Sequence, residues 1–218
     1  MSEESAERVR RIIDILNSDY PDAKCTLDFT TAHELLVAAI LAAQCTDERV
    51  NQVTPALFAK YPNVEAFAAA DRAQLEETVR PTGFFRNKTK SIIESARQIV
   101  TEHAGRVPDT IDELTTLSGV GRKTANLIVG VVYGKPAVIV DTHVKRVSGR
   151  LGLTKETDPT KIESDLREIL PPDDATRFNH LIVALGRTIC KAPTPRCEVC
   201  KLADLCPTGR ERMSLKLQ

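Results

Sequence analysis

Residues 117–126, LSGVGRKTAN, join two segments of helical periodicity and contain two glycines, two cations and a threonine. Such a composition is typical of a loop that holds phosphate. A mononucleotide P-loop requires Gly-x4-Gly-Lys-Ser/Thr, but here Gly121 is followed by Arg122. The dinucleotide fingerprint requires a third glycine where this sequence has Thr124, and no strand precedes the loop. The remaining interpretation is a helix–hairpin–helix at about residues 110–130.

The two glycines of this hairpin explain how it could hold a phosphate. Gly119 and Gly121 can adopt positive φ and allow a phosphate to approach the main chain closely. The N–H groups that open the next helix, at the positive end of its dipole, would then face the phosphate beside Arg122. A main-chain contact of this kind binds a DNA backbone without reading its sequence.

The net charge of the chain is zero, but the charge is distributed unevenly. Residues 1–79 carry 7 Lys/Arg against 14 Asp/Glu, residues 80–150 carry 12 against 6, and residues 151–218 carry 11 against 10. The net charges are therefore −7, +6 and +1. The hairpin lies in the strongly positive third, where a local positive field favours a polyanionic partner. On charge alone, an ordinary solvated face explains the pattern equally well.

Helical periodicity dominates the 218 residues, and the sequence predicts an all-α fold of about ten helices. The expected helices include residues 6–17, 32–44, 87–103, 123–133 and 178–189, the last of them being the final helix. The one β-like run, residues 137–140, has no second strand to pair with. The longest apolar run, residues 35–43, is too short to cross a bilayer, and residues 1–11 do not resemble a secretory signal. We expect a soluble, monomeric cytoplasmic protein that is not bound to a membrane and associates with the nucleoid through DNA.

Four of the six cysteines fall within 17 residues, in the pattern Cys-x6-Cys-x2-Cys-x5-Cys. Disulfides are not expected in a chain without an export signal, so four clustered thiols predict a metal site. Zinc sites more often contain two Cys-x2-Cys pairs, whereas this loop has one, which favours an iron–sulfur cluster and leaves zinc as the alternative. The expected ligands are Cys190, Cys197, Cys200 and Cys206.

Three motifs together resemble the endonuclease III family of helix-hairpin-helix DNA glycosylases: LSGVGRKTAN, VDTHVKRV at residues 140–147, and the four-cysteine loop. The resemblance covers roughly residues 34–206. It implies two helical lobes with the active-site cleft between them. One is a helical barrel of residues 25–135 that contains the hairpin, and the other joins residues 1–24 to 136–218 and holds a [4Fe-4S] cluster.

The resemblance places the family's catalytic lysine at Lys123 and its catalytic aspartate at Asp141. Only a neutral lysine amine can form a Schiff base, and its free pKa is about 10.4. The helix dipole, the neighbouring Arg122 and burial under a docked base would all disfavour the ammonium form. In the family's reaction, Asp141 would stabilise an oxocarbenium-like sugar. The simpler interpretation is that Asp141 is the N-cap of a helix, and the two roles are compatible.

A glycosylase must take the damaged nucleotide out of the duplex, and the family fills the gap with a glutamine and an apolar wedge. By position these are Gln44, in LAAQCTD, and Phe84, in PTGFFRNKTK. Relatives active on thymine glycol usually have leucine at the wedge. Phe84 could instead be a loop aromatic that packs on the core. Further candidate phosphate contacts, each equally interpretable as a surface charge, are Arg86, Lys88, Lys191 and Arg196.

The resemblance implies base-excision repair: removal of oxidised pyrimidines from double-stranded DNA and β-elimination at the abasic site through a lysine Schiff base. The first alternative is a monofunctional adenine-mismatch glycosylase. That branch usually has serine in place of the lysine and a glutamate one turn before the glutamine, whereas this chain has Lys123 and, at the glutamate positions, Ala39 and Ile40. The second alternative is a non-catalytic DNA-binding module with a structural metal.

Overall fold

A computed structural model describes residues 3–215 of the chain, which fold into two compact units. One unit consists of residues 25–134, and the other joins residues 1–24 to residues 135–218. The outermost residues of the second unit, 1–2 and 216–218, lie outside the described part. Every regular element in residues 3–215 is helical, which confirms the all-α fold class. None of the helices in this part of the chain combines the length and the apolar character that crossing a bilayer requires.

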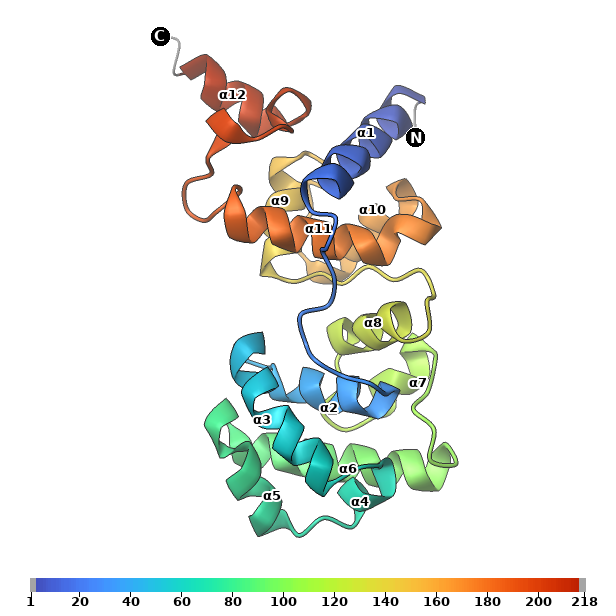
Figure 1. Ribbon diagram of the computed structural model, residues 1–218. Helices are drawn as coiled ribbons and strands as arrows, with labels where there is room; N and C mark the ends of the chain where they lie inside the picture. The colour runs from blue at the N-terminus through green and yellow to red at the C-terminus, as the bar shows by residue number, and fades with distance from the viewer. Residues whose placement is uncertain (1–2, 216–218) are drawn as a thin grey trace. The chain divides into compact units, whose positions relative to one another are not determined.

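The unit of residues 25–134 is built around the long helix α6, against which α2, α4 and α5 pack (Figure 1). Helix α8 packs in turn against α2 and α7. The core is aliphatic, as expected for a chain without tryptophan. The elements are α2 (Ala32–Leu41), α3 (Asp47–Lys60), α4 (Val64–Ala68), α5 (Arg72–Val79), η1 (Arg80–Thr82), α6 (Phe85–Glu102), α7 (Ile111–Thr116) and α8 (Arg122–Val131).

Local capping signals fix where most of these helices begin. The side chains of Thr31, Thr46, Asn63, Asp71 and Thr110 each accept a hydrogen bond from a main-chain N–H in the first turn that follows. A short polar side chain at this position satisfies a donor that has no partner within the helix. These starts can therefore be read from the sequence, without knowledge of the tertiary fold.

The second unit packs helix α11 against α9 and against α1, so that the two ends of the chain share one core (Figure 1). The apolar stripe of α1 contributes Val9, Ile12, Ile13 and Leu16 to this core. The elements are α1 (Glu3–Asp19), α9 (Thr142–Arg150), α10 (Pro159–Ile169), η2 (Pro172–Asp174), α11 (Ala175–Thr188), η3 (Cys197–Val199), η4 (Ala203–Leu205) and α12 (Pro207–Leu215).

Two expectations about the helices differ from the structure. The helix near residues 178–189, α11, is not the last, because α12 follows the cysteine loop, and residues 3–215 contain twelve α-helices rather than about ten. Helix α12 was missed because its apolar residues form no stripe, and of its residues only Gly209 is buried. The β-like run of residues 137–140 forms no strand, although Ala137, Val138 and Ile139 are buried.

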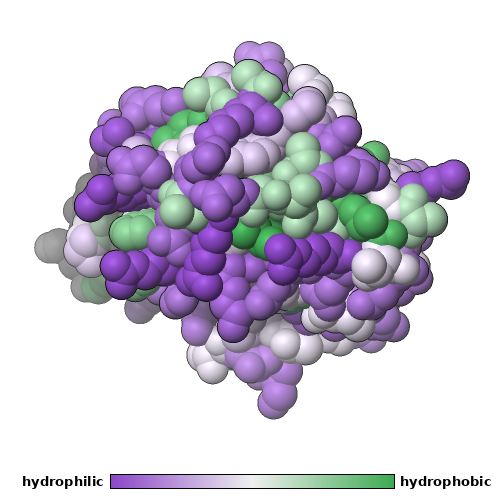
Figure 2. Space-filling view, turned by 90° about the horizontal axis from the view of Figure 1, so that it is seen from below, coloured by the Kyte–Doolittle hydropathy of each residue, from purple (hydrophilic) through white to green (hydrophobic). Residues whose placement is uncertain are grey.

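The surface contrasts with the aliphatic interior. On the face drawn in Figure 2, hydrophilic residues predominate and apolar residues are interspersed among them. Within residues 3–215, only four large hydrophobic side chains are exposed: Phe84, Val199, Met213 and Leu215. Phe84 is one of the two residues expected to fill the gap left by an extruded nucleotide.

Candidate functional site

The loop between α7 and α8 is a tight hairpin held against helix α6. The main-chain N–H of Ser118 donates to Gln98 Oε1 over 2.8 Å, and the Ser118 hydroxyl donates to Glu94 Oε2 over 2.9 Å. Gln98 Nε2 also donates to the carbonyl of Thr116 over 3.2 Å. Gly119 has φ +76°, and a Cβ atom there would lie 2.5 Å from Ser91 Cβ. The hairpin therefore requires glycine at position 119, both for its backbone conformation and for its contact with α6.

Gly121 differs from expectation, because its φ of −92° is not in the left-handed region. It occupies the N-cap position of α8 in extended conformation, and no side chain caps this end of the helix. The backbone of an ordinary residue could adopt this conformation, and a Cβ atom at Gly121 would meet nothing within 4 Å. Glycine at this position leaves the first N–H groups of α8 open to a ligand that approaches from outside.

Arg122 and Lys123 form the first turn of α8 with exposed side chains. Lys123 therefore lies at the positive end of the helix dipole, immediately after the hairpin.

Asp141 is the N-cap of α9, as the simpler interpretation of the sequence predicts. Its Oδ1 accepts a hydrogen bond of 2.7 Å from the N–H of Val144, and the residue is half-buried. Lys123 belongs to the unit of residues 25–134 and Asp141 to the other unit. The capping bond fixes the direction of the carboxylate at the start of α9.

Gln44 and Phe84 share an unusual backbone conformation. Gln44 lies in the turn after α2 with φ +54°, and Phe84 precedes α6 with φ +47°. Within residues 3–215, the only other non-glycine residue with positive φ is Ala104. Gln44 is exposed, and the Phe84 side chain is 62% exposed, which rules out the interpretation of Phe84 as a loop aromatic packed on the core. Such conformations cost free energy and persist only where the surrounding structure imposes them.

The candidate phosphate contacts fall into two groups. Arg86, Lys191 and Arg196 are exposed, and the Arg86 guanidinium lies 5.7 Å from the centre of the Phe85 ring. Lys88 is a correction: its side chain is buried, and its Nζ donates hydrogen bonds to two main-chain carbonyls of its own unit. A buried ammonium with such partners cannot contact a DNA phosphate.

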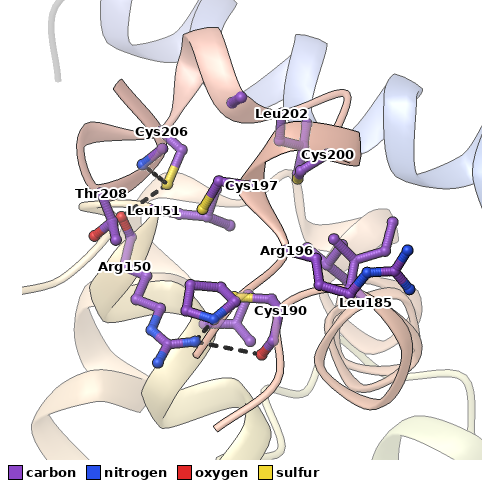
Figure 3. A pocket seen from close by; sticks show the side chains of 15 residues that line it. Arg150, Leu151, Leu185, Cys190, Arg196, Cys197, Cys200, Leu202, Cys206 and Thr208 are labelled. Atoms are coloured by element: carbon purple, nitrogen blue, oxygen red, sulfur yellow. Dashed lines mark hydrogen bonds between the residues drawn. The ribbon is translucent and has the colours of Figure 1, made fainter. Parts of the chain in front are cut away.

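The four clustered cysteines line one pocket in the unit that joins the two ends of the chain (Figure 3). Leu151, Leu185 and Leu202 contribute apolar surface to the pocket, and Arg150 and Arg196 also line it. All four cysteines are free thiols, and burial raises the pKa values of the Cys197, Cys200 and Cys206 thiols. Across residues 3–215, no three Cys, His, Asp or Glu side chains converge closely enough to hold a single ion. The four cysteines nevertheless all line this one pocket.

Hydrogen bonds from two arginines of α9 fix the start of the cysteine loop. Arg150 Nη1 donates to Cys190 Sγ over 3.4 Å (Figure 3). It also donates to the carbonyl of Lys191 over 2.8 Å, and Arg146 Nη2 donates to the carbonyl of Cys190 over 3.1 Å. At the other end of the loop, the N–H of Gly209 donates to Cys206 Sγ over 3.3 Å. Sequence reasoning missed both arginines, although their i, i+4 spacing places them on one face of α9.

Comparison with known proteins identifies the family. Residues 37–172 match the HhH-GPD superfamily base excision DNA repair protein family. The chain is 52% identical over 205 residues to the endonuclease III of Synechocystis sp. and 41% identical over 207 residues to that of Bacillus subtilis, with 94% of each chain covered in both cases. A trapped endonuclease III–DNA covalent intermediate matches the structure with a TM-score of 0.88 at 40% identity, covering 95% of this chain and 98% of that one. The helical fold, the hairpin and these similarities lead to one conclusion: the chain belongs to the endonuclease III family of the HhH-GPD superfamily.

Proposed function

We propose that this protein acts in base-excision DNA repair as a bifunctional DNA glycosylase and abasic-site lyase. The observation that carries the proposal is the exposed Lys123 in the first turn of α8, directly after the glycine hairpin. Family membership supports it, and so does the structural similarity to an endonuclease III trapped covalently on DNA.

Lys123 is the nucleophile of the proposed reaction. Its neutral Nζ attacks C1′ of the deoxyribose, and the bond between C1′ and the base breaks with its electron pair leaving on the base. Loss of the nitrogen proton and opening of the sugar ring, whose oxygen takes up a proton, give an imine between Nζ and C1′. The imine acidifies the 2′ hydrogen, so its removal expels the 3′ phosphate by β-elimination.

Asp141 has two compatible roles in the proposal. One carboxylate oxygen accepts the capping hydrogen bond from Val144 and so fixes the orientation of the group. The negative charge stabilises the positive charge that develops on the sugar as the base departs. The capping bond is a structural contact, whereas the charge acts only during the reaction.

The DNA duplex is held and opened by separate groups of the chain. Gly119, Gly121 and Arg122 contact the phosphate backbone at the hairpin, and Gln44 and Phe84 fill the space vacated by the extruded nucleotide. The exposed cations that add phosphate contacts are Arg86, Lys191 and Arg196. The substrates are duplexes that contain damaged bases, oxidised pyrimidines in particular, or abasic sites.

We assign the pocket of Cys190, Cys197, Cys200 and Cys206 to a [4Fe-4S] cluster, with zinc as the alternative. The residues present fit this group, because four sulfur donors line one pocket and Arg150 Nη1 donates a hydrogen bond to the Sγ atom of one of them, Cys190. Such a cluster supplies cross-links that hold the loop in shape. The purified protein should absorb visible light, as expected for an iron–sulfur cluster and not for zinc. A colourless protein with one bound zinc would refute the iron assignment.

Reductive trapping tests the proposed function. Borohydride should link the wild-type protein covalently to a duplex that contains thymine glycol, and Lys123→Ala should abolish the adduct because no other side chain replaces the amine. The control is Lys60→Ala, an exposed lysine of the same unit, which should trap as the wild type does. An adduct that persists in Lys123→Ala would refute the assignment of the nucleophile.

Two further duplexes, one with an adenine mismatch and one with an abasic site, discriminate between the two alternative functions. An adenine-mismatch glycosylase would release adenine and form no borohydride adduct. A non-catalytic DNA-binding module would bind abasic DNA without nicking it. Either result with the wild-type protein would refute the bifunctional assignment.

A further inference from the structure

Lys88 of helix α6 is a buried cation whose contacts neither the fold nor the proposed reaction explains. Its side chain is 5% exposed, and its Nζ donates hydrogen bonds of 2.7 Å to the carbonyl of Leu41 and of 2.7 Å to the carbonyl of Thr82. Lysines are rarely buried to this extent, because removing an ammonium from water is costly. Burial lowers the pKa of Lys88. A lysine buried at this cost indicates that its hydrogen bonds have a specific role.

The two carbonyls that Lys88 contacts come from distant parts of the sequence. Leu41 is the last residue of α2, three residues before Gln44, and Thr82 is the last residue of η1, two residues before Phe84. The last carbonyls of a helix accept no hydrogen bond from within the helix, so they can accept one from another donor. One ammonium group therefore links the main chain that leads into the Gln44 turn with the main chain that leads into the Phe84 turn.

Both of these turns contain a residue in the left-handed region, which costs free energy. Gln44 has φ +54° and Phe84 has φ +47°, and neither side chain is buried. The packing of these side chains therefore does not hold the two residues in place. A conformation of this kind persists only where the surrounding structure imposes it. The hydrogen bonds from Lys88 restrain both turns from within the unit.

We propose that Lys88 is a positioning residue that cross-links the two turns, so that Gln44 and Phe84 are presented together to the opened base stack. The proposal rests on the gap-filling roles of Gln44 and Phe84 in the proposed function. Lys88 itself contacts neither DNA nor the reacting sugar. It acts by fixing the geometry of the two turns. Its loss should therefore slow the reaction most on substrates that need Gln44 and Phe84 to fill the gap left by an extruded nucleotide.

The variant Lys88→Met tests this proposal, because it keeps the apolar stem and removes the hydrogen-bond donors. Two reactions are compared: base release from a thymine glycol duplex, which requires gap filling, and cleavage of a single-stranded abasic oligonucleotide, which does not. We expect Lys88→Met to slow base release by about tenfold or more, since small displacements of positioning groups have effects of this order. Cleavage of the single strand should change by less than about threefold.

The matched control is Lys90→Met, the same substitution two residues away on the exposed side of α6. It should leave both reactions at the wild-type rate. A purely structural role for Lys88 would lower both reactions equally, because Lys123 belongs to the same unit. Equal losses in the two reactions, or a Lys88→Met protein indistinguishable from Lys90→Met, would overturn the proposal.

A double-mutant comparison tests the route of the effect. In a Gln44→Ala/Phe84→Ala background the two turns carry no side chain large enough to fill the gap. Adding Lys88→Met to this background should therefore slow base release by less than about twofold. Fully additive losses would contradict a route through these two residues. If Lys88→Met does not fold, Lys88→Gln replaces it, because its shorter side chain cannot keep both 2.7 Å contacts. Lys88→Gln should likewise slow base release more than cleavage of the single strand, and equal losses in the two reactions would overturn the proposal.

These outcomes separate the proposal from the proposed function. The function fails if the wild-type protein neither releases thymine glycol nor cleaves abasic DNA. The gap-filling roles fail if the wild type is active and Gln44→Ala/Phe84→Ala is equally active. The positioning role of Lys88 fails if those substitutions slow base release and Lys88→Met does not.

Discussion

At the scale of single residues, the two hairpin glycines have different reasons for being glycine. Gly119 combines a positive φ with a contact to Ser91 that leaves no room for a side chain. Gly121 has neither constraint, since its backbone is extended and the space beside it is open. The protein itself requires the first glycine for folding, whereas the second leaves access to the N–H groups at the start of α8.

Alanine at each glycine should separate these two roles. Gly119→Ala is expected to lower the free energy of unfolding by about 2–4 kcal/mol, from the left-handed backbone and the contact with Ser91. Gly121→Ala should lower the free energy of unfolding by at most about 1 kcal/mol, because alanine is a poorer N-cap. It should weaken binding to an abasic duplex by about tenfold, since a methyl group obstructs the phosphate. Urea unfolding and a binding titration measure the two effects. A Gly121→Ala protein with wild-type affinity would contradict the assigned role.

Asp141 offers a similar separation between folding and chemistry. Asparagine is as good an N-cap as aspartate but carries no charge. Asp141→Asn should therefore keep the thermal stability of the wild type while slowing base release by about a hundredfold, as expected when a charge that stabilises the transition state is removed. Asp141→Ala should lose the activity and, in addition, about 1 kcal/mol of stability. An active Asp141→Asn protein would leave Asp141 with the capping role alone.

At the scale of helices, the starts of most elements depend on local signals. The capping box of α2 is an example: Thr31 accepts from the N–H of Glu34, and Glu34 Oε2 accepts from the N–H groups of Thr30 and Thr31. By contrast, α12 has no apolar stripe and follows the cysteine loop. It packs against η3 and η4, which precede it in the cysteine loop, and against α9, which is distant in the sequence.

The capping box of α2 should make stability depend on pH. Partial burial raises the pKa of Glu34, but hydrogen bonds from Thr30 and Thr31 lower it by more, so the folded pKa lies below the unfolded value of 4.5. The charge of Glu34 therefore stabilises the fold above pH 4.5, and this contribution is lost as the pH falls through the folded pKa. Compared with Glu34→Gln, the wild type should be more stable by roughly 0.5 kcal/mol at pH 7. Melting curves between pH 2.5 and 7 should converge at the acid end; a constant difference would contradict this.

At the scale of the whole molecule, residues from both ends of the chain build one unit. Arg8 of α1 donates to the carbonyls of Leu151 and Leu205, and the apolar face of α1 packs into the core around α11. This core lies directly beside the cysteine pocket, because Leu151, Leu185 and Leu202 belong to both. The stability of the cysteine loop therefore depends on residues near the beginning of the chain.

A substitution in α1 tests this dependence. Ile12 is fully buried, and Ile12→Ala should lower the free energy of unfolding by about 2–5 kcal/mol through the cavity that it leaves. The control is Asp14→Ala on the exposed face of the same helix, which should change stability by less than about 0.5 kcal/mol. Urea unfolding followed by circular dichroism measures both. Equal, small changes would show that α1 contributes little to the core.

The amino-acid sequence by itself determined the helical class, the capped helix starts, the hairpin and the clustering of the four cysteines. These features depend on the spacing of neighbouring residues, so they can be read without the tertiary fold. Only the tertiary structure decided that Lys88 is buried and links two turns, that Gln44 and Phe84 are left-handed and exposed, and that Arg146 and Arg150 hold the cysteine loop. Two of these hydrogen bonds join residues 40 or more positions apart, Lys88 with Leu41 and Arg150 with Cys190. Burial and long-range hydrogen bonds arise only when such distant segments pack, and no local pattern encodes them.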